Sequence, residues 1–539
     1  MVVVRRQNTV DKVENYEVLK PTKTENVKDP ARSMQLQQLG KVLSKLARQC
    51  FKCCWYLIKC LACTFIMFCI ITILFPALLV YNVLRLFEKK WSYHVHGWIA
   101  MSGQDSLWLQ DNKGNRMIIN SAIVVKCDNI PQLVSGLQTI LQRCLLKVDK
   151  KGHKTYSRLK NYIHCGVFQY FLRECDTFDL KHHVYQYQGA TPNSHEEMQS
   201  LFSTMSGEEI SFEQPPWHFV VIPKTYEESN EAIIFFRCHH GVADGISLTR
   251  FLLAEFPDET ILEKKLVKFS SVHRNLMLLN GLLCGAKILL EKLLYPQDNS
   301  IIHGKCPIGQ KKMAWSQPIS LQQVKNIKNY TGTTVNDVLM SCVSMSFHDY
   351  FKAHGISHPP DVTVSVPVDV RSGDQPFALE NNFAIVSLSL PVSKEDALES
   401  LDETKRQMDL IKHSGEAFVF SVGGNLTMEY FPEVITNLWT KPIANKHSSV
   451  LSNVPGPQHE FSIAGNKVTQ MFFTPPQRDL VGIGVGLYSY AGQFSIAVQS
   501  DKNCLDDPKF IVKSFELRLA ELHKTVSSMN KQTEFDRGT

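Results

Sequence analysis

The sequence predicts an α/β protein with mixed sheets packed by helices, preceded by one N-terminal membrane helix. Strand-like and helix-like segments alternate along most of the chain, and a single run of 25 uncharged residues precedes them. The 539 residues are 44% hydrophobic and 20% charged, as in an ordinary globular protein. This composition excludes a mainly disordered chain, a collagen-like chain and a polytopic membrane protein.

Length and charge limit the organisation and the partners. A chain of 539 residues can hold two or three domains or one large two-lobed domain. The formal charge of +6 is small for this length, and Lys and Arg are scattered along the sequence. Nucleic acid is therefore not expected as a partner.

The N-terminal part predicts a tail followed by a membrane anchor. Residues 1–50 are assigned to a disordered tail, because charged and polar residues dominate its first part without periodicity. The anchor is assigned to residues 51–90 and contains the uncharged run from Cys60 to Leu84. As a helix this run is about 37 Å long, enough to cross a ~30 Å hydrocarbon core.

The residues around the anchor bear on its orientation in the membrane. Basic residues before the run outnumber those after it, which favours a cytoplasmic N-terminus. One full span then places the remaining chain on the other side of the membrane. Pro76 also allows a kinked or re-entrant segment. We expect a single-pass membrane protein, in the endoplasmic reticulum.

Six of the fifteen cysteines gather between Cys50 and Cys69. The window holds two C-x-x-C pairs, but the second pair lies inside the apolar run. Apolar packing or S-palmitoylation therefore fits these residues better than zinc, and no metal site is expected. The other cysteines are isolated, as in a reducing compartment.

Three helices are marked by their first residues or their periodicity. Asp128 and Pro131 open a pattern that places Leu133, Leu137, Ile140, Leu141 and Cys144 on one face. Ser393 and Asp396 start a second helix, which runs to about His413. A third closes the chain over residues 506–530.

Strands and lobes are predicted from apolar runs and from the segments that separate them. The strand candidates are 231–238, 361–368, 383–392, 461–474 and 481–499. An apolar segment at 276–294 is interrupted by polar residues, which favours an interfacial or core helix over a second span. The domain prediction is an N-terminal lobe over 91–260, a linker over 261–318, a C-terminal lobe over 319–530 and a tail over 531–539.

The most informative segment is HHGVADG at residues 239–245, which follows an apolar strand. A neutral imidazole at the end of a rigid strand suits a general base, because its pKa lies near neutral pH. His239 and His240 point to opposite sides of the strand, which disfavours a shared metal ion. Asp244 lies across a turn permitted by Gly241 and Gly245, where it can pair with an arginine or orient a histidine.

Several segments in a fixed order resemble the wax ester synthase/diacylglycerol acyltransferase family. They are MSGQDSLWL (101–109), PPW (215–217), HHGVADG (239–245), TVNDVLM (334–340), VPVDVR (366–371), SNVPGP (452–457) and LYSYAG (487–492). The resemblance covers residues 98 to 530, so the N-terminal 90 residues lie outside it. It implies two chloramphenicol-acetyltransferase-like lobes that enclose a tunnel.

The resemblance also implies roles for individual residues. His240 is the expected base that removes a proton from an acceptor hydroxyl, which then attacks an acyl-CoA thioester. Asp244 is expected to be structural, with Arg371 or Arg250 as its partner. The Asn336 amide, at a helix start, can stabilise oxyanion charge or simply begin the helix.

The expected function is a membrane-anchored O-acyltransferase that makes wax esters, and also triacylglycerol if diacylglycerol is accepted. Its expected partners are acyl-CoA, a lipid alcohol and the membrane, with acyl-CoA as co-substrate and no other cofactor. Two alternatives stay open. One is a different acceptor such as a sterol or retinol, and the other is a non-catalytic lipid-binding protein of the same fold.

Overall fold

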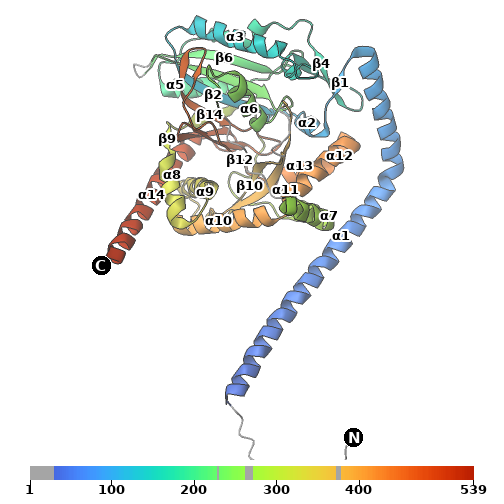
Figure 1. Cartoon of the computed structure of the whole chain (residues 1–539), viewed down its shortest axis with the longest axis vertical. Helices are drawn as coiled ribbons and strands as arrows, with labels where there is room; N and C mark the ends of the chain where they lie inside the picture. Colours follow the sequence, from blue (N-terminus) through green and yellow to red (C-terminus); the bar gives the residue numbers. More distant parts are fainter. Residues whose placement is uncertain (1–29, 227–229, 262–270, 372–377, 539) are drawn as a thin grey trace, which may run out of the picture. The chain divides into compact units, whose positions relative to one another are not determined.

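The computed structural model describes residues 30–226, 230–261, 271–371 and 378–538 (Figure 1). The chain divides into two units, residues 1–59 and residues 60–539. Within the described residues, the first unit holds only the N-terminal part of helix α1. All other elements lie in the second unit.

Helix α1 runs from Pro30 to His96. We expected disorder up to residue 50, and residues 1–29 lie outside the described part. From Pro30 onward the chain is helical instead, because Leu, Gln, Lys, Arg and Ala dominate this stretch and all favour helix. By length and composition, the segment Leu43–His96 can cross a membrane, and only 6% of its most apolar window is buried.

A six-stranded mixed sheet forms the centre of the N-terminal lobe, in the order β13-β14-β2-β7-β6-β5. Its strands are β2 (Ile118–Lys126), β5 (Val184–Gln186), β6 (Trp217–Lys224), β7 (Glu231–His239), β13 (Ser462–Ile463) and β14 (Asn466–Thr474). A separate sheet has the order β1-β4-β3, with β1 (Ile99–Ala100), β3 (Asn161–Cys165) and β4 (Tyr170–Glu174).

A seven-stranded mixed sheet forms the C-terminal lobe, in the order β11-β10-β12-β15-β16-β8, with β9 also paired to β16. Its strands are β8 (Lys311–Trp315), β9 (Ile319–Ser320), β10 (Val362–Asp369), β11 (Phe383–Leu390), β12 (Ser449–Val454), β15 (Ile483–Tyr490) and β16 (Gln493–Asp501). The predicted α/β class with mixed sheets is thereby confirmed.

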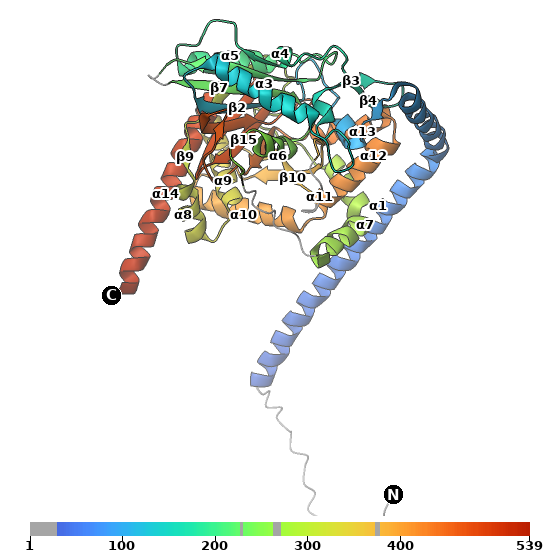
Figure 2. The same cartoon turned by 45° about the horizontal axis from the view of Figure 1, so that its top comes forward.

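Helices cover both large sheets, and Figures 1 and 2 show α8, α9 and α10 grouped around the C-terminal sheet. The helices of the N-terminal half are α2 (Gly103–Leu107), α3 (Ile130–Leu146), α4 (Leu180–His183), α5 (His195–Gly207), α6 (Gly245–Glu255) and α7 (Ser271–Leu294). Those of the C-terminal half are α8 (Leu321–Thr331), α9 (Val335–Ala353), α10 (Ala397–His413), α11 (Glu416–Phe418), α12 (Gly424–Tyr430), α13 (Glu433–Ala444) and α14 (Pro508–Gly538).

The two lobes share strands, which the linear division into 91–260 and 319–530 did not anticipate. β14 comes from the C-terminal half but pairs with β2, with Phe472 opposite Ala122. Its apolar side chains Met471 and Phe473 enter the core of the N-terminal lobe. A local sequence pattern cannot predict this pairing, because the pattern of β14 is that of a strand whichever strand it pairs with.

The predicted elements are present, with several differences in their bounds. The strand candidates 461–474 and 481–499 each hold two strands, β13 with β14 and β15 with β16. α3 is capped by Asn129, whose side chain accepts from the Gln132 backbone N–H, and not by Asp128. α14 continues to Gly538, through the segment expected to be a tail. Asp396 caps α10 as expected.

Candidate active site

The segment HHGVADG joins the end of β7 to the start of α6, and both ends are fixed by hydrogen bonds. β7 ends at His239, and the His240 backbone N–H donates to the Met117 carbonyl at 2.6 Å. α6 begins at Gly245, where Asp244 Oδ1 accepts from the Ser247 backbone N–H at 2.8 Å. The turn between them therefore has little freedom.

His240 is almost completely buried among aromatic rings. Its imidazole stacks on Trp108 with 4.3 Å between ring centroids, and Phe383 lies 5.5 Å away. The ring Nδ1 has no hydrogen-bond partner within the described residues. Burial lowers the pKa of His240 to about 4, although the charge of Asp244 acts in the opposite direction. The imidazole is therefore neutral at neutral pH and can accept a proton.

His239 differs from its neighbour because both of its ring nitrogens are engaged. Nδ1 accepts from the Gly241 backbone N–H at 3.1 Å, so Nε2 carries the hydrogen and donates to Asp111 Oδ1 at 3.2 Å. Asp111 Oδ1 also accepts from the Met117 backbone N–H. His239 thus ties β7 to the segment that precedes β2.

Asp244 pairs with Arg371, and this contact decides between the two predicted arginines. Arg371 Nη2 lies 2.5 Å from Asp244 Oδ2, and both side chains are buried. The same carboxylate oxygen accepts from the Asn382 backbone N–H. With Oδ1 capping α6, Asp244 connects the lobes and positions the turn.

A second buried hydrogen-bond network holds the backbone at His240. Asn381 Nδ2 donates to the His240 carbonyl at 2.8 Å and to Asp105 Oδ1 at 2.9 Å. Arg158 donates to both Asp105 oxygens and to the Val242 carbonyl. Burial alone would raise the pKa of Asp105, but Arg158 and the hydrogen bonds hold it below its usual range.

Sequence reasoning missed this second network. Asp105 and Trp108 lie in the motif MSGQDSLWL, which was noted only as part of a resemblance. Arg158 and Asn381 lie far from it in the sequence and carry no motif of their own. Only the fold brings these residues to one turn.

The two glycines of the turn do not supply left-handed backbone angles, because neither has a positive φ. A Cβ on Gly241 would lie 2.4 Å from Leu109 Cδ2, so the Leu109 side chain would have to move to make room for it. A Cβ on Gly245 would meet nothing within 4 Å, because Gly245 borders a pocket.

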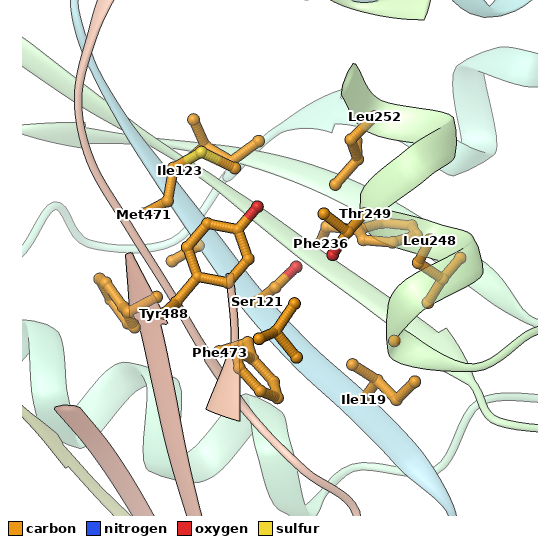
Figure 3. Close-up of a pocket in the computed structure, with 14 residues that line it drawn as sticks. Ile119, Ser121, Ile123, Phe236, Leu248, Thr249, Leu252, Met471, Phe473 and Tyr488 are labelled. Carbon is orange, nitrogen blue, oxygen red and sulfur yellow. The ribbon is translucent and has the colours of Figure 1, made fainter. Parts of the chain in front are cut away.

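That pocket is apolar and lies between strands of both halves of the chain (Figure 3). Its cavity volume is about 40 Å³. Gly245, Leu248, Thr249 and Leu252 of α6 line one side, and the Tyr488 hydroxyl points into it. The remaining lining residues are Ile119, Ser121, Ala122, Ile123, Phe236, Val454, Met471, Phe472 and Phe473. His240 is not part of the lining.

Asn336 lies in the first turn of α9, and it is not the residue that caps the helix. Thr334 and Asp337 form a reciprocal capping box there. The Asn336 Oδ1 accepts from Asn453 Nδ2 instead. Asn453 precedes Val454 of the pocket wall, so Asn336 is connected to the pocket rather than to the HHGVADG turn.

Two family profiles match the chain. Residues 101–281 match the wax ester synthase/diacylglycerol acyltransferase catalytic domain, and residues 379–523 match the WS/DGAT C-terminal domain. The first match contains HHGVADG and the Asp105 network except Asn381, which lies in the second.

Curated relatives carry O-acyltransferase names, and solved structures share the fold. A probable diacylglycerol O-acyltransferase of Mycobacterium tuberculosis is 23% identical over 374 residues, covering 64% of this chain and 79% of that protein. The O-acyltransferase WSD of Acinetobacter baylyi is 20% identical, covering 62% and 79%. The crystal structure of a wax ester synthase/diacylglycerol acyltransferase from Marinobacter aquaeolei has a TM-score of 0.57 at 18% identity, covering 79% of this chain and all of that chain. The trichothecene 15-O-acetyltransferase of Fusarium sporotrichioides has a TM-score of 0.53 at 11% identity, covering 80% and 95%.

Proposed function

The chain belongs to the wax ester synthase/diacylglycerol acyltransferase family of O-acyltransferases, as its motifs predict, and on this premise we propose that it transfers a fatty acyl group from acyl-CoA to a long-chain alcohol, with diacylglycerol as a second acceptor. The observation that carries the proposal is the buried, neutral imidazole of His240. It lies at a turn that buried hydrogen bonds of Asp244 and of Asn381 fix.

In the proposed reaction His240 acts as the base. Its imidazole takes the proton of the acceptor hydroxyl while the oxygen attacks the thioester carbonyl carbon. The tetrahedral intermediate then collapses to the ester, and the C–S bond breaks. The imidazolium returns its proton to the departing CoA thiolate, which is favourable because burial makes the charged ring a strong acid.

The other site residues act by position and by charge. Asp244 and Asn381 hold the turn, so that the imidazole keeps one orientation on Trp108. An oxyanion role for Asn336 stays a prediction: its amide lies in the first turn of α9, where the helix dipole favours negative charge, but its contact is with Asn453 and not with the HHGVADG turn.

The apolar lining of the pocket beside α6 supports a substrate with an apolar chain. Aliphatic and aromatic side chains dominate its lining, so a hydrocarbon chain gains free energy by leaving water there. Ser121, Thr249 and Tyr488 supply the few polar groups of the lining.

Membrane association is the second part of the proposal. Helix α1 is long and apolar enough for it, and both a long-chain alcohol and diacylglycerol reside in membranes. The endoplasmic reticulum stays a prediction.

An acyl-transfer assay with radiolabelled palmitoyl-CoA tests the function. Full-length protein is offered fatty alcohols, diacylglycerol, a sterol and retinol, and wild type is compared with His240→Ala. The matched control is His182→Ala, because His182 is an exposed histidine of a second His-His pair. Transfer to fatty alcohols that only His240→Ala abolishes supports the proposal. Transfer to the sterol or retinol alone selects another acceptor, and no transfer by wild type favours a lipid-binding role.

A further inference from the structure

Helix α1 contacts the folded lobes at both ends of its apolar run. At one end, the Cys60 sulfur lies 3.5 Å from the Cys284 sulfur of α7, and both residues are buried. At the other end, Arg85 Nη2 lies 3.2 Å from Glu429 Oε1 of α12. These contacts join one continuous helix to two separate helices of the same body.

The spacing of these contacts is incompatible with a simple span. Cys60 and Arg85 are 25 residues apart, which is about 37 Å along a helix and more than the ~30 Å hydrocarbon core. If α1 crossed the bilayer, Cys60 and Arg85 would lie at opposite membrane surfaces. The lobes would then have to reach both surfaces at once.

The lobes do not reach through a bilayer, because both contact helices are tied to folded structure with a charged surface. Glu429 also accepts from the Gly103 backbone N–H of α2, the helix that carries Asp105. α7 is tied to the C-terminal lobe by an ion pair between Lys292 and Glu416. Charged and polar side chains of α10 face solvent on that lobe, and their transfer into hydrocarbon would be costly.

Exposed apolar side chains continue from α1 onto the helices beside it. In α1, Ile73 is 78% exposed, and in α7, Leu282 is 76% exposed. In α13, Val434 and Leu438 are 78% and 72% exposed. Helix α7 packs against α11 and α13, and α12 packs against α13. Figures 1 and 2 both show these helices grouped on the side of the body next to α1.

We propose that this protein is monotopic: the apolar run of α1 lies along one leaflet together with the exposed apolar side chains of α7, α12 and α13. These residues form the docking surface, whose further members are Leu276, Leu279, Leu283, Leu294, Leu426 and Tyr430. Its occupant is the lipid of a single leaflet, because the surface is continuous with an apolar run of 25 uncharged residues.

This inference rests on the proposed membrane association and extends it. In this arrangement the catalytic lobes stay on the side of the membrane where acyl-CoA is found. The basic residues before the apolar run favour a cytoplasmic N-terminus, and the lobes then stay on that same side, because no segment of α1 has to cross. A lipid acceptor also reaches the lobes laterally, from the leaflet in which it is dissolved.

Depth-dependent quenching tests the arrangement in the full-length protein. A fluorescent amino acid is placed singly at Ile73, Leu282 and Leu438, and the protein is reconstituted in phosphatidylcholine vesicles. The lipid chains carry bromine either near the carbonyl end or near the methyl end. The matched control is Leu517 of α14, which is 71% exposed and outside the docking surface.

We expect all three docking positions to be quenched more strongly by bromine near the carbonyl end, and Leu517 not to be quenched. Strongest quenching of Ile73 by bromine near the methyl end, with Leu282 and Leu438 unquenched, would overturn the inference and establish a span. If Leu282 and Leu438 are unquenched and the protein is a dimer in solution, the surface is assigned to a second copy. Protein that does not float with vesicles at all would contradict the membrane part of the proposed function instead.

A pair of charge variants gives an independent readout. Leu282→Glu with Leu438→Glu is expected to lower the share of protein that floats with vesicles at least several-fold, whereas Leu517→Glu leaves it unchanged. Acyl transfer to a short, dispersed alcohol should stay the same in the double variant and in the control, because none of the three positions touches the site. Unchanged flotation of the double variant would count against the docking surface.

Discussion

Arg371 and Asp244 form a buried ion pair that joins the two lobes across the HHGVADG turn. The Arg371 Nη2 to Asp244 Oδ2 distance is 2.5 Å, and the side chains are 4% and 5% exposed. Arg371 follows β10, and Asp244 caps α6. The Asp244 carboxylate therefore binds Arg371 at the lobe junction and the N-terminus of α6. His240 is oriented by the aromatic rings around it and by Asn381.

Removal of one partner of this pair should lower the free energy of unfolding. We expect Arg371→Met to cost about 3–5 kcal/mol, because it leaves a buried carboxylate uncompensated. Asp244→Asn should reduce both the melting temperature and the acyl-transfer rate, and the double variant should be less destabilised than the sum. Thermal unfolding of the purified protein measures these effects.

An exposed pair serves as the control for that experiment. Arg406→Met breaks a surface ion pair with Glu403 on α10 and should cost less than about 1 kcal/mol. Asp244→Asn with an unchanged melting temperature and no activity would make Asp244 a participant in the chemistry.

The two histidines should separate in their effects on rate and stability. His240→Ala should reduce acyl transfer by at least the ~100-fold typical of a lost general base. His239→Ala should cost less in rate and more in melting temperature, because it leaves Asp111 without its ring N–H donor. Initial rates and thermal unfolding of both variants check this. Equal and modest rate losses in the two variants would contradict the assignment of His240 as the base.

The acid limb of the activity should lie near the low pKa of His240. Burial lowers this pKa to about 4, below the ~6.5 of a free histidine, so the neutral base persists in the fold down to about pH 5. The unfolded chain binds more protons between these pKa values. The stability that His240 contributes is therefore complete above about pH 6.5 and is lost as the pH falls towards 4.

A profile of kcat/KM against pH, with a short dispersed alcohol, measures this limb. His447 provides the control, because burial lowers its pKa to about 4 as well, and it bonds to Ser387 in the other lobe. His447→Gln should reduce the acid sensitivity of the melting temperature and leave the activity profile in place. An acid limb centred near the ordinary histidine pKa would contradict the assignment.

Local patterns predicted the elements of the fold, and long-range pairing escaped them. The strand at 231–238 and the helix from Asp396 follow from apolar runs and caps, which are properties of neighbouring residues. The pairing of β14 with β2 joins residues about 350 positions apart, for example Phe472 with Ala122. Nothing in either strand specifies its partner.

The site divides in the same way. His240 and Asp244 stand together in one motif, so the sequence identified both. Asn381 and Arg158 carry ordinary polar side chains in unremarkable segments, and their role arises only where the fold buries them against the turn. The choice of Arg371 over Arg250 likewise required the position of β10.

Truncations should separate the two units of the chain. Deletion of residues 1–59 removes only the first unit, so the melting temperature and the transfer to short dispersed alcohols should stay unchanged. Deletion of residues 1–90 also removes Arg85 and Glu88, which bind Glu429 and the backbone N–H groups of Val167 and Phe168. It should lower the melting temperature by several degrees while activity on short alcohols remains. Loss of that activity in the shorter deletion would show that residues 1–59 contribute to the site.

Substitutions of Gly245 should change the chain length that the enzyme accepts. A Cβ at this position meets no atom within 4 Å and faces the apolar pocket, so Gly245→Ala should fold normally and keep most activity. Gly245→Leu extends into space that we assign to a hydrocarbon chain, so transfer should fall more for long chains than for short ones. The ratio of kcat/KM for a long and a short substrate, measured separately for the acyl donor and the alcohol, shows which chain the pocket holds. Gly241→Ala is the contrasting variant, because its Cβ would lie 2.4 Å from Leu109 Cδ2 and should lower the melting temperature without changing the chain-length preference. If Gly245→Leu lowers transfer of every chain length by the same factor at an unchanged melting temperature, the pocket does not hold a chain and Gly245 acts on the HHGVADG turn itself.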